Sequence, residues 1–466
     1  MSVAGGKVRE AKIELYRKKG TIHARAVKGR FNSLRWAMVW FTQIIFYGAC
    51  WLQWSGHEGV RQALWFDIPE RKLHLFGLVL WPQDALLFAM ALIVAGVGLF
   101  FATALAGRVF CGFACPQTVY TQIFTWIEAK VEGDHLARLR LDQAPMSPRK
   151  FVIKASKHLL WALVAAWTAI TFVGYFTPIR ELLPALASLS TGPWESFWLI
   201  FYALFTYALA GLARESVCQH MCPYSRIQGV MVDAATRVVS YDVARGEPRG
   251  SLRSTAPKGD CVDCSLCVQV CPVGIDIREG QQYACINCGL CIDACNPVMT
   301  RIGAPTGLIR YASESELAGQ ARGGLFGPPR VRAYACLLAA VGGLSLWMLV
   351  DRAPVALDVL RDRNALMRET PAGHIENVYT LKVANFEERP RTYRVAVEGV
   401  SGLRIEGARE FSAAGGSMSS LPVRVAADPA VVGSGIHRIE FALEALDRSD
   451  RFGQRRVLQQ SSFVMP

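Results

Sequence analysis

The chain has 466 residues and a net charge of +13, and 52% of its residues are hydrophobic whereas only 19% are charged. This composition, with a mean hydropathy of +0.23, argues against an ordinary soluble protein and predicts membrane helices. The length allows two or three domains.

Residues 1–35 form a basic tail. They carry ten Lys and Arg residues against two glutamates, a net charge of +8 that is more than half of the total. A basic tail can bind nucleic acid, but beside a membrane helix it more often sets topology or contacts anionic lipid. We therefore expect this tail in the cytoplasm and expect no nucleic-acid partner.

Five uncharged apolar runs are each long enough to cross a bilayer as a helix. A buried core helix is the alternative, but it is seldom so long and uncharged on every face. The first four runs predict a membrane bundle over residues 36–213. A shorter patch, Leu73–Gln83, is interpreted as an interfacial or re-entrant piece. The five runs are Trp36–Trp54, Ala85–Ala106, His158–Phe176, Ser196–Ala213 and Ala333–Val350.

The distribution of Lys and Arg predicts the orientation of the chain. Segment 107–157 carries eight of these residues, whereas 177–195 carries only Arg180. The positive-inside rule then places the tail, 107–157 and 214–332 in the cytoplasm. The outer segments are 55–84, 177–195 and 351–466.

Two related motifs, CGFACP and CQHMCP, follow the second and fourth runs. Cysteines at i and i+4 lie on one face of a helix, so we expect each pair to present its sulfurs together. The proline after each pair, Pro116 or Pro223, favours a bend or the start of a new helix. We call the four cysteines the thiol quartet: Cys111, Cys115, Cys218 and Cys222.

The surroundings of the quartet leave two interpretations open. Arg108 and Arg214 stand nearby and are expected to favour the thiolate forms. The alternative is that four small apolar side chains merely pack at helix ends. His220, inside the second pair, is either an additional nitrogen ligand or an exposed or packing residue.

Eight of the 14 cysteines lie between residues 261 and 295, in two C-x2-C-x2-C-x3-C sets. This is the spacing with which bacterial ferredoxins hold two [4Fe–4S] clusters, where the fourth cysteine of each set reaches the other cluster. The sequence therefore predicts an α+β ferredoxin-like domain, with a core of about 255–300, inside the cytoplasmic segment. The predicted ligands are Cys261, Cys264, Cys267 and Cys295 for one cluster, and Cys285, Cys288, Cys291 and Cys271 for the other.

Zinc ribbons and disulfides are alternatives for these eight cysteines. Zinc sites rarely use two tandem sets of this spacing, and disulfides are disfavoured in a reducing cytoplasm. The second set departs from the ferredoxin pattern because Asn296 separates Cys295 from Pro297.

Residues 354–466, after the fifth run at 333–350, change in character. Short alternating stretches such as Tyr379–Phe386, Arg391–Val400 and Gly435–Leu446 are separated by Gly, Pro, Asp and Asn. Roughly seven strands in about a hundred residues predict an immunoglobulin-like β-sandwich. We interpret it as a docking or structural domain.

This order of parts resembles the FixG/RdxA/CcoG family, the accessory proteins of cbb-type cytochrome c oxidase. The strings GRVFCGFACPQTVYTQIF, WIEAKVEGD, CQHMCPYSRIQG and YDVARGEPRG carry the resemblance from about residue 30 onward. It implies a multi-pass protein of the bacterial inner membrane that reduces Cu(II) to Cu(I) for oxidase assembly. The implied partners are oxidase subunits, copper chaperones or transporters, and a cytoplasmic electron donor; a homo-oligomer is left open.

Copper chemistry would use the quartet, because soft sulfur ligands suit Cu(I). Two other functions are weighed against it. One is a membrane electron-transfer subunit of the quinol-dehydrogenase kind, which has no evident need for an outer sandwich. The other is a non-catalytic iron–sulfur sensor or scaffold. A haem subunit is disfavoured, because the chain has no C-x-x-C-H motif and no histidine pair within the runs.

Overall fold

The protein is described from a computed structural model of the chain. Residues 1–21, which hold much of the predicted basic tail, lie outside the described part. The chain divides into two compact units, and each is described by itself. The described residues are 22–466 except 57–58, 253–256, 321–323, 325, 363–366, 388 and 447–455. The first unit contains residues 1–42, 99–165 and 203–335, and the second contains 43–98, 166–202 and 336–466.

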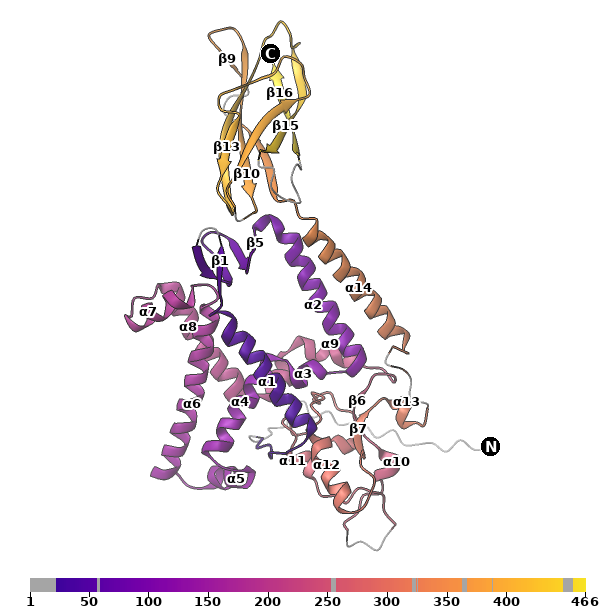
Figure 1. Cartoon of the computed structure of the whole chain (residues 1–466). Helices are drawn as coiled ribbons and strands as arrows, with labels where there is room; N and C mark the ends of the chain where they lie inside the picture. The colour runs from indigo at the N-terminus through magenta and orange to yellow at the C-terminus, as the bar shows by residue number, and fades with distance from the viewer. Residues whose placement is uncertain are drawn as a thin grey trace. The chain divides into compact units, whose positions relative to one another are not determined.

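Within the described residues, four helical segments are long and apolar enough to cross a membrane, one fewer than predicted. In the most apolar windows of α2 and α14, only 6% and 0% of the residues are buried, as expected of helices that face lipid. The segments are α2 (Ala85–Ala106) with the preceding turn η1 (Pro82–Asp84), α6 (Pro148–Val173), α8 (Pro193–Thr206) with the π-helix η2 (Tyr207–Ala213), and α14 (Pro329–Val350) (Figure 1).

The first predicted span is wrong in its bounds. Helix α1 covers Arg30–Ala49, and it begins before Trp36 because the Asp293 carboxylate caps its first turn. The backbone N–H groups of Phe31 and Asn32 donate to Asp293 at 3.2 and 2.7 Å. Beyond Ala49 the chain turns into strand β1, so the helix contains fewer apolar residues than the run suggested.

The patch Leu73–Gln83, expected to be an interfacial or re-entrant piece, consists mainly of paired strands. It contains strands β4 (Lys72–Leu75) and β5 (Leu78–Leu80), which form an antiparallel sheet with β3 (Leu64–Asp67). Strand pairing provides hydrogen-bond partners for backbone N–H and C=O groups that an unpaired re-entrant segment would leave unsatisfied. A second hairpin joins β1 (Gln53–Gly56) to β2 (Gly59–Gln62).

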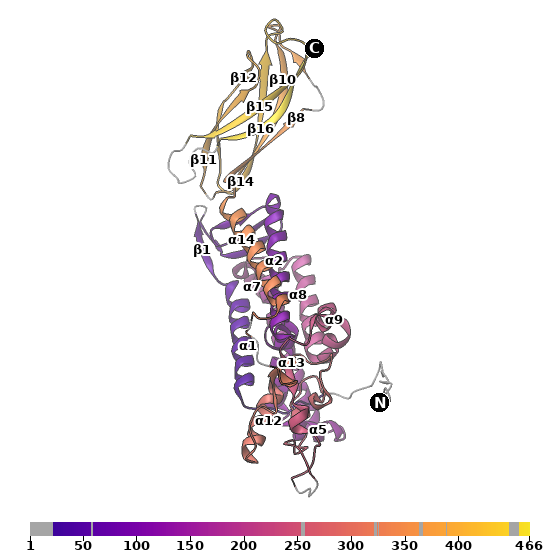
Figure 2. The ribbon, with the colours of Figure 1, turned by 90° about the vertical axis from the view of Figure 1, so that its right-hand side faces the viewer.

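The C-terminal domain is a β-sandwich, as predicted (Figures 1 and 2). Alternate residues of β10 are buried, and the ring of Tyr379 packs edge-on against Phe441 with centroids 5.0 Å apart. One sheet has the order β12-β14-β10-β8 with β9 on β10, and the other β13-β11-β15-β16. The strands are β8 (Val355–Arg361), β9 (Arg368–Glu369), β10 (Ile375–Asn385), β11 (Arg391–Glu398), β12 (Arg404–Glu406), β13 (Glu410–Ala413), β14 (Ser417–Ala427), β15 (Gly435–Ala445) and β16 (Val457–Met465).

The first unit contains the cysteine-rich segment together with parts of the membrane helices. Helix α4 packs on α6 and η2, where the rings of Phe124 and Trp161 stack with centroids 5.2 Å apart. Strand β6 (Val238–Tyr241) pairs with β7 (Ile309–Ala312) beside the cysteine loops. The other helix of the second unit is α7 (Ile179–Ala187). The other helices of the first unit are α3 (Val109–Phe113), α4 (Pro116–Val131), α5 (His135–Gln143), η3 (Val217–Met221), α9 (Pro223–Met231), α10 (Val243–Gly246), α11 (Leu266–Gln269), η4 (Ile277–Glu279), α12 (Leu290–Arg301) and α13 (Glu314–Leu317).

Candidate functional site

The two cysteine loops share one backbone conformation. Asp263 and Ser265 in the first loop, and Asn287 and Gly289 in the second, have φ between 50 and 72° at equivalent positions around the second cysteine. These left-handed residues turn the chain just before the helix that carries the third cysteine, α11 for Cys267 and α12 for Cys291. Local spacing therefore produces the same loop twice.

Each loop borders a small cavity. The first cavity is lined by Cys261, Cys264, Cys267 and Cys295, together with apolar side chains such as Met299 and Leu308. The second is lined by Cys271, Cys285, Cys288 and Cys291, with Cys267 at its edge and apolar walls from Val239 and Ile277. Each cavity thus gathers three cysteines of one set together with the fourth cysteine of the other, and Cys267 lines both cavities.

Five of the eight thiols lie in desolvating surroundings that raise their pKa: Cys267, Cys271, Cys285, Cys291 and Cys295. Burial raises the pKa of Cys267 to about 12 and that of Cys271 to about 11. Hydrogen bonds from the backbone N–H groups of Val273, Gly274 and Ile275 lower the pKa of Cys271 and so partly offset the effect of burial. Four sulfurs around an apolar cavity, with N–H groups aimed at one of them, fit a [4Fe–4S] cluster.

Iron content provides a direct test of this arrangement. We expect about eight irons per chain after anaerobic reconstitution, and about four in a Cys264→Ser variant that loses one cluster. Cys336→Ser, at an exposed cysteine outside the motifs, is the matched control and should keep the wild-type content. A wild-type content of about four irons would contradict the presence of two clusters.

The thiol quartet does not lie on continuous helices. Cys111 is in α3 and Cys218 is in the π-helix η3, whereas Cys115 and Cys222 are extended residues that precede α4 and α9. The prediction that each pair shares a helix face is therefore wrong. The prediction that each proline starts a new helix is confirmed, since Pro116 and Pro223 are the first residues of α4 and α9. Proline fits that position because it has no N–H to leave unsatisfied.

The two pairs nevertheless converge. Burial, with smaller contributions from the charges of Cys115, Cys218 and Cys222, raises the pKa of Cys111 to about 12, so all four sulfurs lie within electrostatic reach. Burial likewise raises the pKa of Cys218 to about 11. Arg108 lowers the pKa of Cys111 and of Cys218, the direction expected of it, but desolvation outweighs this effect.

The two arginines have other partners. Arg108 donates to the Ser225 hydroxyl at 2.9 Å and lies over the Tyr283 ring. Arg214 donates to Glu128 at 2.7 Å. Cys111 itself donates to the amide oxygen of the fully buried Gln228 at 3.1 Å.

The quartet is not a preformed site for one ion. As the side chains lie, no group of three or more His, Cys, Asp or Glu among the described residues is spaced to hold a single metal ion. His220 is exposed in η3 between Cys218 and Cys222. Binding of a soft ion there requires rotation of the thiols or coordination by only two of them.

Helix α3 lies directly against the second cluster loop. Cys111 belongs to the same buried cluster as Cys288 and Ile286, with Cys271 and Cys285 packed around it. A Cβ atom at Gly112 would stand 2.6 Å from the Ile286 carbonyl oxygen and 3.1 Å from the Cys288 Cα. Only glycine allows this approach, a role that the sequence analysis did not assign to Gly112.

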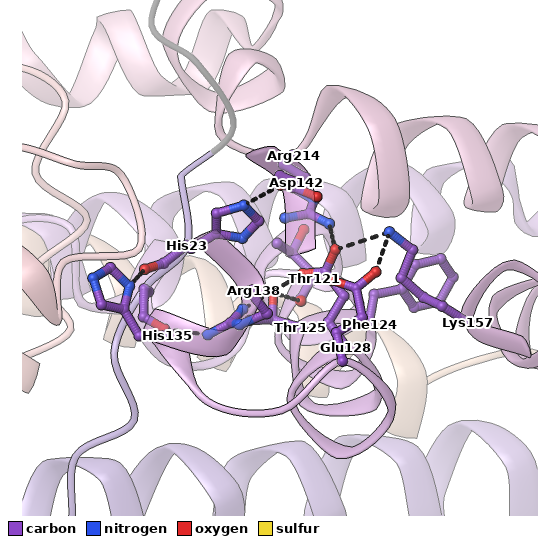
Figure 3. A network of polar contacts seen from close by, with 12 residues as sticks. His23, Thr121, Phe124, Thr125, Glu128, His135, Arg138, Asp142, Lys157 and Arg214 are labelled. Atoms are coloured by element: carbon purple, nitrogen blue, oxygen red, sulfur yellow. Dashed lines mark hydrogen bonds and ion pairs between the residues drawn. The ribbon is translucent and has the colours of Figure 1, made fainter. Parts of the chain in front are cut away.

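A buried charge network lies beside the site and was also missed. Glu128, 1% exposed, pairs with Arg214 at 2.7 Å, Lys157 at 3.4 Å and Arg138 at 3.6 Å. Figure 3 shows Arg214 and Lys157 directed at Glu128, and His23 directed at Asp142. The string WIEAKVEGD contains two glutamates of this region, Glu128 inside α4 and Glu132 at its C-terminal cap.

Three protein-family descriptions match the chain: "4Fe-4S dicluster domain" over residues 213–314, "4Fe-4S binding domain" over 88–132, and the "IG-like fold at C-terminal of FixG" over 345–466. Protein RdxA of Cereibacter sphaeroides is 40% identical over 84% of this chain and 86% of its own length. Nitrogen fixation protein FixG of Rhizobium meliloti is 36% identical over 83% and 80%. A FixG-related crystal structure from Vibrio parahaemolyticus covers 24% of this chain and 96% of its own, at 33% identity and a TM-score of 0.21.

Proposed function

Since the chain belongs to the FixG/RdxA family of iron–sulfur electron-transfer proteins, we propose that it reduces Cu(II) to Cu(I) at the thiol quartet. The observation that carries the proposal is the packing of Cys111 and Gly112 against the loop of Cys288. Bound clusters at the two cysteine sets would supply single electrons at that contact. Each electron converts one Cu(II) to one Cu(I).

The quartet suits the product of this reaction. Thiolates are soft ligands that prefer Cu(I), and metal binding to thiols with a raised pKa releases their protons. Cys111, Ile286 and Cys288 are buried against one another between the two sites. The same packing also supports the quartet as a site distinct from the eight predicted cluster ligands.

The biological setting follows from the resemblance. We propose that the Cu(I) serves maturation of a cbb-type cytochrome c oxidase, and that a copper chaperone or transporter exchanges the metal. We place the N-terminus and the cluster domain in the cytoplasm and the sandwich in the periplasm, on the positive-inside distribution of charge. A reporter fused after Pro466 should be active only outside the cytoplasm.

The test replaces Cys115 and Cys222 by serine, singly and together. Purified protein is reduced anaerobically with dithionite, Cu(II) is added, and cluster absorbance and Cu(I) are followed together. In the double variant, the affinity for copper and the rate of copper reduction should each fall by more than roughly 10–100-fold. That range is the usual cost of losing a residue that only supports a metal ligand, whereas this variant loses two direct ligands. Cluster spectra should be unchanged.

Cys336→Ser is the control and should reduce copper like the wild type. If the double variant also binds and reduces copper normally, the quartet only packs the helix ends. If clusters in the wild type never pass electrons to copper, the sensor or scaffold interpretation is favoured instead.

A further inference from the structure

One cavity of the first unit touches both redox groups. One wall comes from residues beside the cluster cysteines, including Val270 and Pro272, which flank Cys271, and Ile286. Cys218 of the quartet lines it as well. A ligand in this cavity would therefore lie next to the second cluster site without entering it.

The cavity holds buried polar groups, including an atom that lacks a partner. Arg138 is 1% exposed, and its Nε has no hydrogen-bond partner. The buried Thr118 hydroxyl also lines the cavity, beside the Cys115 thiol. Arg35, 5% exposed, donates from its Nε to the Gly112 carbonyl oxygen at 3.1 Å and makes no ion pair with any carboxylate of the described residues. A buried donor left unsatisfied costs free energy, which a ligand with acceptor oxygens would recover.

The rest of the lining is apolar and aromatic. The rings of Trp36 and Trp126 meet edge to face with centroids 6.2 Å apart, and Trp126 is 49% exposed at the surface. Val273 and Leu290 line the same cavity. An inorganic anion would not use such walls, whereas a flat ring bearing oxygens and an apolar tail matches both kinds of surface.

A carboxylate also lines the cavity. Glu215 is half-buried and makes no ion pair with another residue in the part of the chain that the structure describes. Its charge acts on Cys218, so it lies close to the quartet. A free carboxylate among buried arginines is placed to accept a proton from a ligand hydroxyl whose acidity those cations increase.

We infer that this cavity binds a membrane quinol, which is the electron donor for the proposed copper reduction. Arg138 and Thr118 donate hydrogen bonds to the ring oxygens, and Glu215 accepts the first proton. Oxidation of one quinol to quinone releases two electrons and two protons; the two cluster sites take one electron each, and the second proton passes to water. One quinol thus reduces two Cu(II). The inference rests on the proposed function for its electron acceptor.

The experiment uses the purified full chain and decylubiquinol as the probe. Anaerobic stopped-flow absorbance measures the rate at which the quinol reduces the clusters. For each variant this rate is divided by the rate of cluster reduction by dithionite, which gives the normalised quinol rate. Separately, quenching of tryptophan fluorescence measures the affinity for oxidised decylubiquinone, which requires no electron transfer. Variants are Glu215→Gln and Thr118→Val, with Glu279→Gln, at an exposed glutamate outside the cavity, as the matched control.

Glu215→Gln should lower the normalised quinol rate on the order of 100-fold and leave quinone affinity near the wild-type value. Thr118→Val should weaken quinone binding about 3–10-fold through one lost hydrogen bond. Glu279→Gln should change neither. The inference is overturned if decylubiquinol does not reduce the wild-type clusters, or if both cavity variants behave like the control. Failure of dithionite-reduced protein to reduce Cu(II) would instead refute the proposed copper reduction.

Discussion

Replacement of Gly112 by alanine is expected to slow electron transfer from the clusters to copper on the order of 100-fold, the effect of a displacement of about 1 Å at a reacting site. The new Cβ would lie 2.6 Å from the Ile286 carbonyl oxygen, a distance that carbon and oxygen atoms do not tolerate. Helix α3 must then move away from the cluster loop. The quantity to measure is the rate at which dithionite-reduced clusters are reoxidised by Cu(II).

Gly229→Ala is the matched control for this substitution. Gly229 is also helical, in α9 just after the second C-x3-C-P motif, but a Cβ there would meet only Tyr283 at an ordinary 3.5 Å. Its transfer rate should equal that of the wild type. Iron content and copper affinity should be unchanged in both variants. A wild-type rate in Gly112→Ala would show that electrons do not cross at this contact.

Replacement of Glu128 by glutamine is expected to destabilise the first unit by about 3–5 kcal/mol, the usual cost of removing one partner from a buried ion pair. Burial alone would raise the pKa of Glu128, but Arg214, Lys157 and Arg138 outweigh it and hold the pKa below its ordinary value. The carboxylate is therefore ionised at neutral pH, and its loss leaves three cations without their shared anion. The apparent Tm in detergent should fall clearly.

Asp142→Asn provides the comparison within the same network. The Asp142 side chain is 37% exposed and pairs with Lys154 at 2.7 Å and with the buried His23 at 2.6 Å, so its loss should cost about 1.5–3 kcal/mol, less than that of Glu128. Because the folded-state pKa of Glu128 is depressed, the stability it contributes is present above its unfolded pKa and is lost as the pH falls through the folded value. The Tm difference between wild type and Glu128→Gln should therefore shrink in acid. Equal Tm values at neutral pH would show that the network does not stabilise the fold.

The sequence by itself determined the parts whose structure is local. The spacing of Cys261, Cys264 and Cys267 is enough to specify a ferredoxin loop, because three thiols within one turn of chain need no distant partner. The alternation of apolar and polar residues along β10 predicted a sandwich strand, because successive side chains of a strand face the core and the solvent in turn. Helix α2 could be predicted as a membrane helix because a long apolar run without charges needs no distant partner to cross a bilayer.

Tertiary structure alone decided how these parts meet. The backbone contact of Gly112 with Ile286, the convergence of the two cysteine pairs and the grouping of three cations around Glu128 all join segments far apart in the chain. The raised pKa of Cys111 has the same origin, since burial by the cluster domain outweighs the arginine that its neighbouring sequence provides. Desolvation and close packing depend on what surrounds a residue in space, and spacing along the chain contains no record of those neighbours.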